Sequence, residues 1–170
     1  WVLNMNSKIL QFDLSGNLLQ EYGESGAGMG QFYKPTAIVC GRDISDSQIP
    51  YFEPFANNRF VYVADAGNDR LVQMSAELET LSIIKGKPFD FNGPRYLDFD
   101  SKGRRYVADK YAHQIKLISP DHELFYTLGQ DRAGKGPGLF DRPEGVVIHG
   151  DQVWFSDTYN NRIVRYRIRE

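Results

Sequence analysis

A short stretch that recurs along this chain of 170 residues constrains its fold more than any other feature. The stretch Val63–Leu71 reads Val-Ala-Asp-Ala-Gly-Asn-Asp-Arg-Leu, and related copies begin at Val2, Val107 and Phe155. Its aspartate recurs at intervals of 44 and 48 residues, as Asp65, Asp109 and Asp157. A period of this size without helical periodicity is typical of repeat proteins whose unit is a small sheet, and specifically of propeller blades.

Each copy predicts the same local structure, namely a strand, a tight polar turn and a second strand. The first run is rich in aromatic and β-branched residues, as in Phe60–Val63, and the second alternates between apolar and polar residues. The pattern predicts an all-β chain with inner strands near residues 36–40, 95–99 and 144–149. The second strand of each blade is expected near residues 60–64, 105–108 and 152–156.

The repeats divide the chain into two complete four-stranded blades with three strands on either side. The expected divisions are a partial blade at 1–32, a blade at 33–91, a blade at 92–140 and a partial blade at 141–170. Together they make about three and a half blades. The chain also begins with Trp1 inside a predicted strand. We therefore expect a segment of a longer protein, whose ring is closed by further blades or by a partner.

The repeated aspartates resemble catalytic residues, but their repetition indicates a structural role. A reaction rarely needs three equivalent copies of one residue, whereas a carboxylate can satisfy backbone amides in every blade. We therefore expect Asp65, Asp109 and Asp157 to accept hydrogen bonds from turn amides within their own blades.

Two glycine-rich links, Gly26–Phe32 and Gly134–Phe140, share the pattern Gly-x-Gly-x-Gly-x-Phe. Neither is followed by a helical pattern or by the Lys-Ser/Thr of a phosphate-binding loop. Each leads into a proline and a new strand. The links are therefore predicted to connect blades, with the phenylalanine at the seam between them.

The second blade carries an insertion at residues 41–59, where the other blades cross in a few residues. A loop of this length is uncommon unless it is functional or disordered. Its aromatic residues make it a candidate partner-binding loop, with packing on the rim of its own blade as the alternative. These residues are Tyr51, Phe52 and Phe55.

Composition narrows the function classes without selecting one. The chain is 41% hydrophobic and 25% charged with a net charge of -2, which is globular and gives no general attraction to nucleic acid. Its apolar runs are too short to cross a bilayer. The single cysteine, Cys40, is expected to be a small buried residue. No cofactor or metal motif is present, and the compartment is not indicated.

At these motifs the sequence resembles the NHL-repeat propellers. Gly30-Gln31-Phe32 with Pro35 fits the start of their blade, and Tyr62–Asp65 and Asn161-Arg162-Ile163 fit its later strands. The resemblance implies a β-propeller of four-stranded blades that closes at six, so that the three and a half blades of this chain would be about half of a six-bladed propeller. It says little about function, because such propellers serve as scaffolds, RNA-binding proteins and enzymes.

Among enzymes, the pattern is most similar to that of the peptidyl-hydroxyglycine lyases. That resemblance implies zinc-binding histidines at the starts of the inner strands, but the matching residues here are Thr36, Arg95 and Glu144. The three histidines of the chain lie elsewhere in the pattern, so a histidine zinc site is not expected in this segment. They are His113, His122 and His149.

The resemblance also implies that the inner strands begin around the mouth of the channel. The residues at these positions differ from blade to blade. Structural positions repeat in every blade, whereas binding positions need not. The candidate ligand or partner site is therefore Thr36, Arg95, Tyr96 and Glu144, although Arg95 and Glu144 could simply form an ion pair.

The last predicted strand carries a basic row, Arg165, Arg167 and Arg169. This row is interpreted as a solvated edge strand rather than a phosphate-binding surface.

Two classes of function remain. A non-catalytic interaction or scaffold module with a protein partner is favoured, because no catalytic spacing is present. The alternative is a propeller enzyme, similar to peptidyl-hydroxyglycine lyases, lactonases or strictosidine synthases, whose catalytic residues lie partly outside this segment. RNA binding is the weakest interpretation, since the basic residues are scattered.

Overall fold

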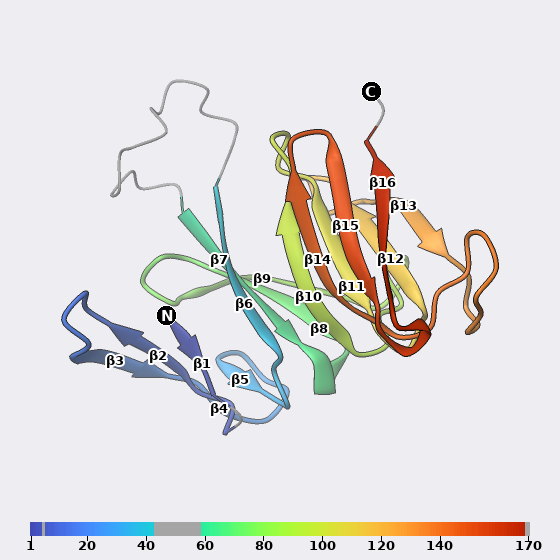
Figure 1. Cartoon of the computed structure of the whole chain (residues 1–170). Coiled ribbons are helices and arrows are strands. Elements are labelled where there is room, and N and C mark those ends of the chain that lie inside the picture. The colour runs from blue at the N-terminus through green and yellow to red at the C-terminus, as the bar shows by residue number, and fades with distance from the viewer. Residues whose placement is uncertain (5, 43–58, 169–170) are drawn as a thin grey trace.

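The computed structural model describes residues 1–4, 6–42 and 59–168. Its strands form four consecutive antiparallel sheets, which we call blades 1 to 4, and Figure 1 shows them side by side in chain order. Within the described residues the only helices are two single turns, η1 (Ala66–Asn68) and η2 (Thr158–Asn160). The all-β fold and the predicted propeller blades are confirmed.

Blades 2 and 3 each contain four strands in sequence order. Those of blade 2 are β6 (Ala37–Arg42), β7 (Arg59–Asp65), β8 (Arg70–Met74) and β9 (Thr80–Lys85). Those of blade 3 are β10 (Pro94–Phe99), β11 (Arg105–Asp109), β12 (Gln114–Ile118) and β13 (Leu124–Gly129).

Blades 1 and 4 contain three described strands each. Blade 4 consists of β14 (Pro143–His149), β15 (Gln152–Asp157) and β16 (Arg162–Arg167). Blade 1 consists of β1 (Val2–Leu3), β2 (Ile9–Phe12) and β3 (Leu18–Tyr22). In the link that follows, β4 (Glu24–Ser25) and β5 (Gln31–Phe32) pair in parallel. All three predicted inner strands are therefore present, as β6, β10 and β14.

The apolar core is divided among the three seams between neighbouring blades. Each seam contains a buried cluster to which both of its blades contribute. Every cluster includes a phenylalanine from the link, and these residues are Phe32, Phe91 and Phe140. The predicted position of Phe32 and Phe140 is thus confirmed. Phe140 lies edge-on to Phe155 of blade 4, with 4.8 Å between ring centroids.

One residue prediction is wrong, since Cys40 is exposed. In blade 3 the equivalent residue, Phe99, packs against Gly41 of the inner strand of blade 2. Blade 1 has no inner strand among its described residues, so nothing comparable covers Cys40 on that side. The insertion residues Tyr51, Phe52 and Phe55 lie outside the described residues.

No helix of the described residues is long and apolar enough to span a membrane.

Candidate functional site

The recurring aspartates lie at the end of each blade where the inner strand begins, and they bind the polypeptide link to the blade. Asp65 is fully buried, and its Oδ1 accepts a hydrogen bond from the Tyr33 amide at 2.7 Å. Its Oδ2 accepts from Arg70 Nε at 2.7 Å. The Arg70 guanidinium in turn donates to the carbonyls of Ala27 and Gln31 in the link.

The same arrangement recurs in the other blades. Asp157 accepts from the Asp141 amide and from Arg162, which donates to the carbonyl of Leu139. In blade 3 the position of the arginine is taken by Gln114, and Lys116, two residues further along the strand, pairs with Asp109 instead. Burial raises the pKa of Asp109, and the ammonium of Lys116 opposes that shift.

The three aspartates are therefore structural, as the repetition predicted. The predicted partner was wrong in detail, because the amide belongs to the link before the inner strand and not to the turn after the second strand. In a propeller blade these two segments lie at the same end of the sheet, and the sequence alone did not distinguish them.

The predicted site residues lie at this end of the inner strands, but each of them makes different contacts. The Thr36 hydroxyl donates to the Arg95 carbonyl at 2.9 Å and so joins the inner strands of blades 2 and 3. Glu144 pairs with Lys110 at 2.5 Å, and not with Arg95. Within the described part of the chain, the guanidinium of Arg95 forms no ion pair.

Lys110 is a site residue that the sequence interpretation missed. It is buried and reaches across the seam from blade 3 to Glu144 of blade 4. Its position in the repeat is occupied by Ala66 in blade 2 and Thr158 in blade 4. A lysine among such residues is a departure from the repeat, and that departure was the available signal.

Half-exposed tyrosines surround this ion pair. The ammonium of Lys110 lies 5.3 Å from the ring centroid of Tyr111 and 5.7 Å from that of Tyr159. The Arg142 guanidinium lies 4.3 Å from the Tyr159 centroid. At these distances each cation is attracted to the face of the ring by a cation–π interaction.

Blade 2 supplies a third tyrosine by a different route. The Tyr33 ring covers Gly67, whose added Cβ would lie 2.4 Å from it, and Lys34 lies over the same ring. In blade 3 the roles are exchanged, since Tyr111 stands in the turn and covers Gly93. We call this surface the tyrosine face and define it as Tyr33, Lys34, Lys110, Tyr111, Arg142 and Tyr159.

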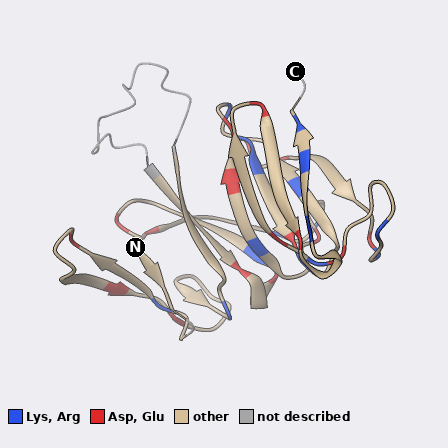
Figure 2. Ribbon diagram, viewed as in Figure 1, with Lys and Arg blue, Asp and Glu red and all other residues tan. Residues whose placement is uncertain are grey.

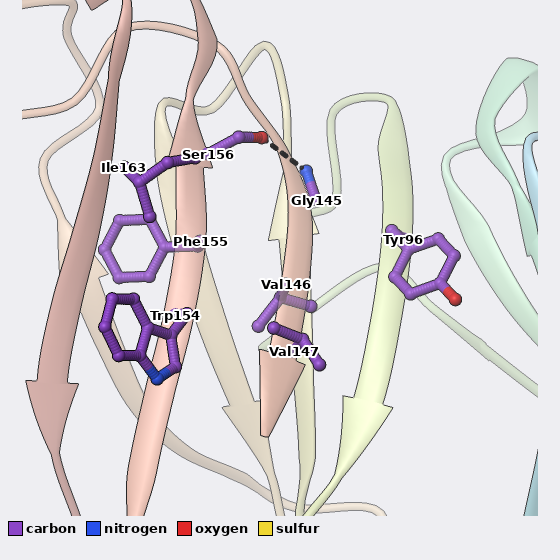
Figure 3. A pocket seen from close by; sticks show the side chains of 8 residues that line it. All are labelled: Tyr96, Gly145, Val146, Val147, Trp154, Phe155, Ser156 and Ile163. Atoms are coloured by element: carbon purple, nitrogen blue, oxygen red, sulfur yellow. Dashed lines mark hydrogen bonds between the residues drawn. The ribbon is translucent and has the colours of Figure 1, made fainter. Parts of the chain in front are cut away.

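Tyr96, the remaining predicted residue, belongs to a separate apolar groove. Figure 3 shows it on the strand next to Val147, with Trp154, Ile163 and Ser156 beyond Val147 on blade 4. The groove has a volume of about 310 Å³ and is almost entirely apolar. Ser156 Oγ accepts a hydrogen bond from the Gly145 amide at 2.8 Å, so its one hydroxyl is occupied by the backbone.

The groove lies on the face that each preceding blade buries in a seam. Trp154 and Ile163 correspond to Tyr106 and Ile115 of blade 3, which lie in the seam with blade 4. In blade 4 the same face is open, and Ile163 is 66% exposed. Its chemistry is therefore that of a surface for packing blades.

The remaining charges give no further catalytic arrangement among the described residues. Figure 2 shows the Lys and Arg residues interspersed with Asp and Glu over the sheets. No group of three or more His, Cys, Asp or Glu among them could hold a metal ion. His113 Nδ1 accepts a hydrogen bond from the Arg142 amide at 3.2 Å.

The basic row on β16 is engaged locally, as its interpretation as a solvated strand predicted. Arg165 lies 5.2 Å from the Trp154 ring, and Arg167 pairs with Asp151 at 3.2 Å. Arg169 lies outside the described residues.

No protein-family model matches the sequence, and no curated protein matches it. Solved structures do resemble the fold. Virginiamycin B lyase from Staphylococcus aureus is 17% identical with a TM-score of 0.60, over 98% of this chain and 50% of that one. A protein of unknown function from Bacteroides caccae is 11% identical with a TM-score of 0.62, over 95% and 56%. The chain thus spans about half the length of the propellers it resembles, and the likeness establishes the fold alone.

Proposed function

We propose that this chain is part of an NHL-type propeller that acts as a non-catalytic protein-interaction module through the tyrosine face. The observation that carries the proposal is that three tyrosines, one in each of blades 2 to 4, are 45 to 50% exposed at the same end of the sheets. Tyrosine and arginine are enriched where proteins bind proteins, because they combine apolar area with polar ends at low entropic cost.

The chemistry of the face favours a protein segment that carries carboxylates. Lys34 of this face forms no ion pair with the described residues, and Arg142 is about two-fifths exposed over Tyr159. Arg95, near the start of β10 and outside the face as defined, is also without an ion pair among the described residues. The Lys110–Glu144 pair lies across the seam beneath the tyrosines and fixes blades 3 and 4 relative to one another. The rings would therefore meet a partner without first having to be ordered.

The alternative is a propeller enzyme related to lyases, lactonases or strictosidine synthases. Its support is the likeness of the fold to virginiamycin B lyase and the position of the Lys110–Glu144 pair among residues that differ between blades. In this alternative the catalytic groups lie partly outside the 170 residues.

Site-specific photo-crosslinking tests the interaction proposal. A photoreactive phenylalanine placed at Tyr111 or Tyr159 is expected to capture the same protein from an extract of the source cells. The matched control is Phe125, which is more exposed than either tyrosine but lies on the outer strand β13. With the captured protein purified, the Tyr111→Ala/Tyr159→Ala variant should bind at least tenfold more weakly.

Two results would reject the proposal. One is capture of the same proteins from position 125 as from positions 111 and 159. The other is unchanged affinity in the double variant. Quinupristin, with which a virginiamycin B lyase has been crystallised, tests the alternative, because its binding to this chain in calorimetry would favour an enzyme.

A further inference from the structure

A buried arginine in blade 3 departs from the repeat in a way that the fold does not require. Arg105 is the first residue of β11 and is 1% exposed. The equivalent residues of blades 2 and 4 are Val61 and Val153, both buried in seams. A valine therefore suffices for packing at this position.

The guanidinium of Arg105 has an unsatisfied edge. Its Nη1 donates to the Tyr62 hydroxyl at 2.8 Å, across the seam in blade 2. Nε and Nη2 are buried and have no hydrogen-bond partner among the described residues. Buried polar groups nearly always have a hydrogen-bond partner, so two buried donors of one guanidinium without a partner need an explanation.

The other buried cations of the described chain are all neutralised by a carboxylate. Arg70 pairs with Asp65, Lys110 with Glu144 and Lys116 with Asp109. Arg105 forms no such pair. The charge of Arg105 is therefore exceptional in this structure.

Nε and Nη2 lie on the same edge of the guanidinium plane. Their N–H groups point in parallel and match two oxygens of one carboxylate, phosphate or sulfate. A single water oxygen or a chloride can also accept from both donors, but only an oxyanion offers each donor an oxygen of its own together with a compensating negative charge. The geometry therefore favours an oxyanion.

The surroundings favour the same conclusion. Ser82 Oγ and His122 Nδ1 lie 3.3 Å apart beside this seam and supply further polar groups. Burial lowers the pKa of His122, and the positive charge of Arg105 lowers it further. The nearby Asp121 is exposed and makes no hydrogen bond to Arg105, so its negative charge acts on the guanidinium only through space and leaves Nε and Nη2 without an acceptor.

We propose that Arg105 forms a binding site for a small oxyanion in the seam between blades 2 and 3, with Nε and Nη2 holding two of its oxygens. The ligand class is a carboxylate or a phosphate or sulfate group. This site lies in the seam and does not depend on the proposed function of the tyrosine face.

Thermal unfolding of the 170-residue chain tests the proposal with inorganic phosphate, sulfate or acetate against chloride at constant ionic strength. A ligand that binds only the folded state raises the Tm, so we expect a saturable rise of several degrees in the oxyanions. Phosphate and sulfate also stabilise proteins by exclusion from the surface. The informative quantity is therefore the part of the rise that Arg105→Val removes.

Arg105→Val introduces the residue of the other two blades, so we expect a folded chain that is at least as stable in chloride and has lost the saturable rise. Arg167→Gln removes an exposed arginine and should retain the rise in full. The proposal is overturned if the oxyanions stabilise Arg105→Val as much as the unchanged chain. It is also overturned if Asp121→Asn abolishes the rise, because Asp121 would then be part of the response.

A crystal structure grown in selenate gives an independent answer that needs no variant. Anomalous density for a selenium atom whose oxygens lie within hydrogen-bond distance of Nε and Nη2 would support the site. Donation of both nitrogens to Asp121 or to another protein group would reject it.

Discussion

At the scale of single residues, the most consequential group is the buried carboxylate at the start of each seam. Asp65 is bound by a backbone amide and by Arg70, and Arg70 holds carbonyls of the preceding link. A buried ion pair adds little net stability compared with apolar residues, but removing one partner leaves the other charge buried and unpaired.

Asp65→Ala is therefore expected to lower the free energy of unfolding by about 3–5 kcal/mol. Asp151→Ala breaks the exposed pair with Arg167 and should cost less than about 1 kcal/mol. Urea denaturation of the two variants measures the difference. Equal losses of unfolding free energy in the two variants would mean that the buried Asp65 does not hold the link to blade 2.

Tyr106 provides a test of burial by pH. Burial raises its pKa to about 12, and the neighbouring Asp100 adds to the shift. Because the pKa is raised in the folded state, neutral Tyr106 contributes fully to the free energy of unfolding below about pH 10. This contribution is lost as the pH rises towards 12. Ultraviolet titration should show a last tyrosinate step that Tyr106→Phe removes and Tyr126→Phe leaves in place.

Residue roles were only partly predictable from the sequence. The structural role of the aspartates followed from their repetition, because equivalent residues do equivalent work. Their amide partners did not, since the sequence does not show which of two loops at one end of a sheet is nearer. Lys110 and Arg105 were not predictable from repetition, because these two residues depart from the repeat.

At the scale of elements, each link carries a phenylalanine that joins two blades. Phe140 is buried with residues of both blade 3 and blade 4. The strands on either side were predictable, because a period of two residues that recurs in phase specifies both the strand and its buried face. The exposure of Cys40 was not, because it depends on which strand lies in the neighbouring blade.

Phe140→Ala should reduce the free energy of unfolding by about 3–5 kcal/mol, the cost of a cavity in a packed core. Phe125→Ala removes the same side chain from the exposed outer strand and should stay within about 0.5 kcal/mol. Chemical denaturation followed by tyrosine and tryptophan fluorescence compares the two. A small loss for Phe140→Ala would show that the seam repacks.

At the scale of the whole molecule, stability resides in the contacts between neighbouring blades. Such a chain behaves as an array in which each unit is stabilised by the next. The apolar face of blade 4 has no neighbour within the described structure, and its Val147, Trp154 and Ile163 form a continuous exposed surface. Large exposed apolar patches promote association.

We expect the 170-residue chain to associate with itself as its concentration rises, through this face. Ile163→Lys places a charge at the centre of the face and should shift the chain towards monomer in analytical ultracentrifugation. Leu81→Lys, on the exposed side of β9, is the matched control and should associate like the unchanged chain. A monomer at every concentration in the unchanged chain would contradict the expectation.

The hydrogen bonds that hold each link to the following blade also affect what happens when the backbone is cut within a link. A cut at the exposed Arg132 would leave Leu139 bound to Arg162, and Asp141 bound to Asp157. The Gly134 carbonyl would also remain bound by Asn160. These three contacts lie within the later piece and keep the link on blade 4. The two pieces would be held together by the seam between blades 3 and 4, where Lys110 pairs with Glu144 and the Ile148 amide donates to Asp98. A protease that nicks this loop should therefore release no fragment until this seam opens. The same loop is a natural place at which to split the molecule in two or to join new termini.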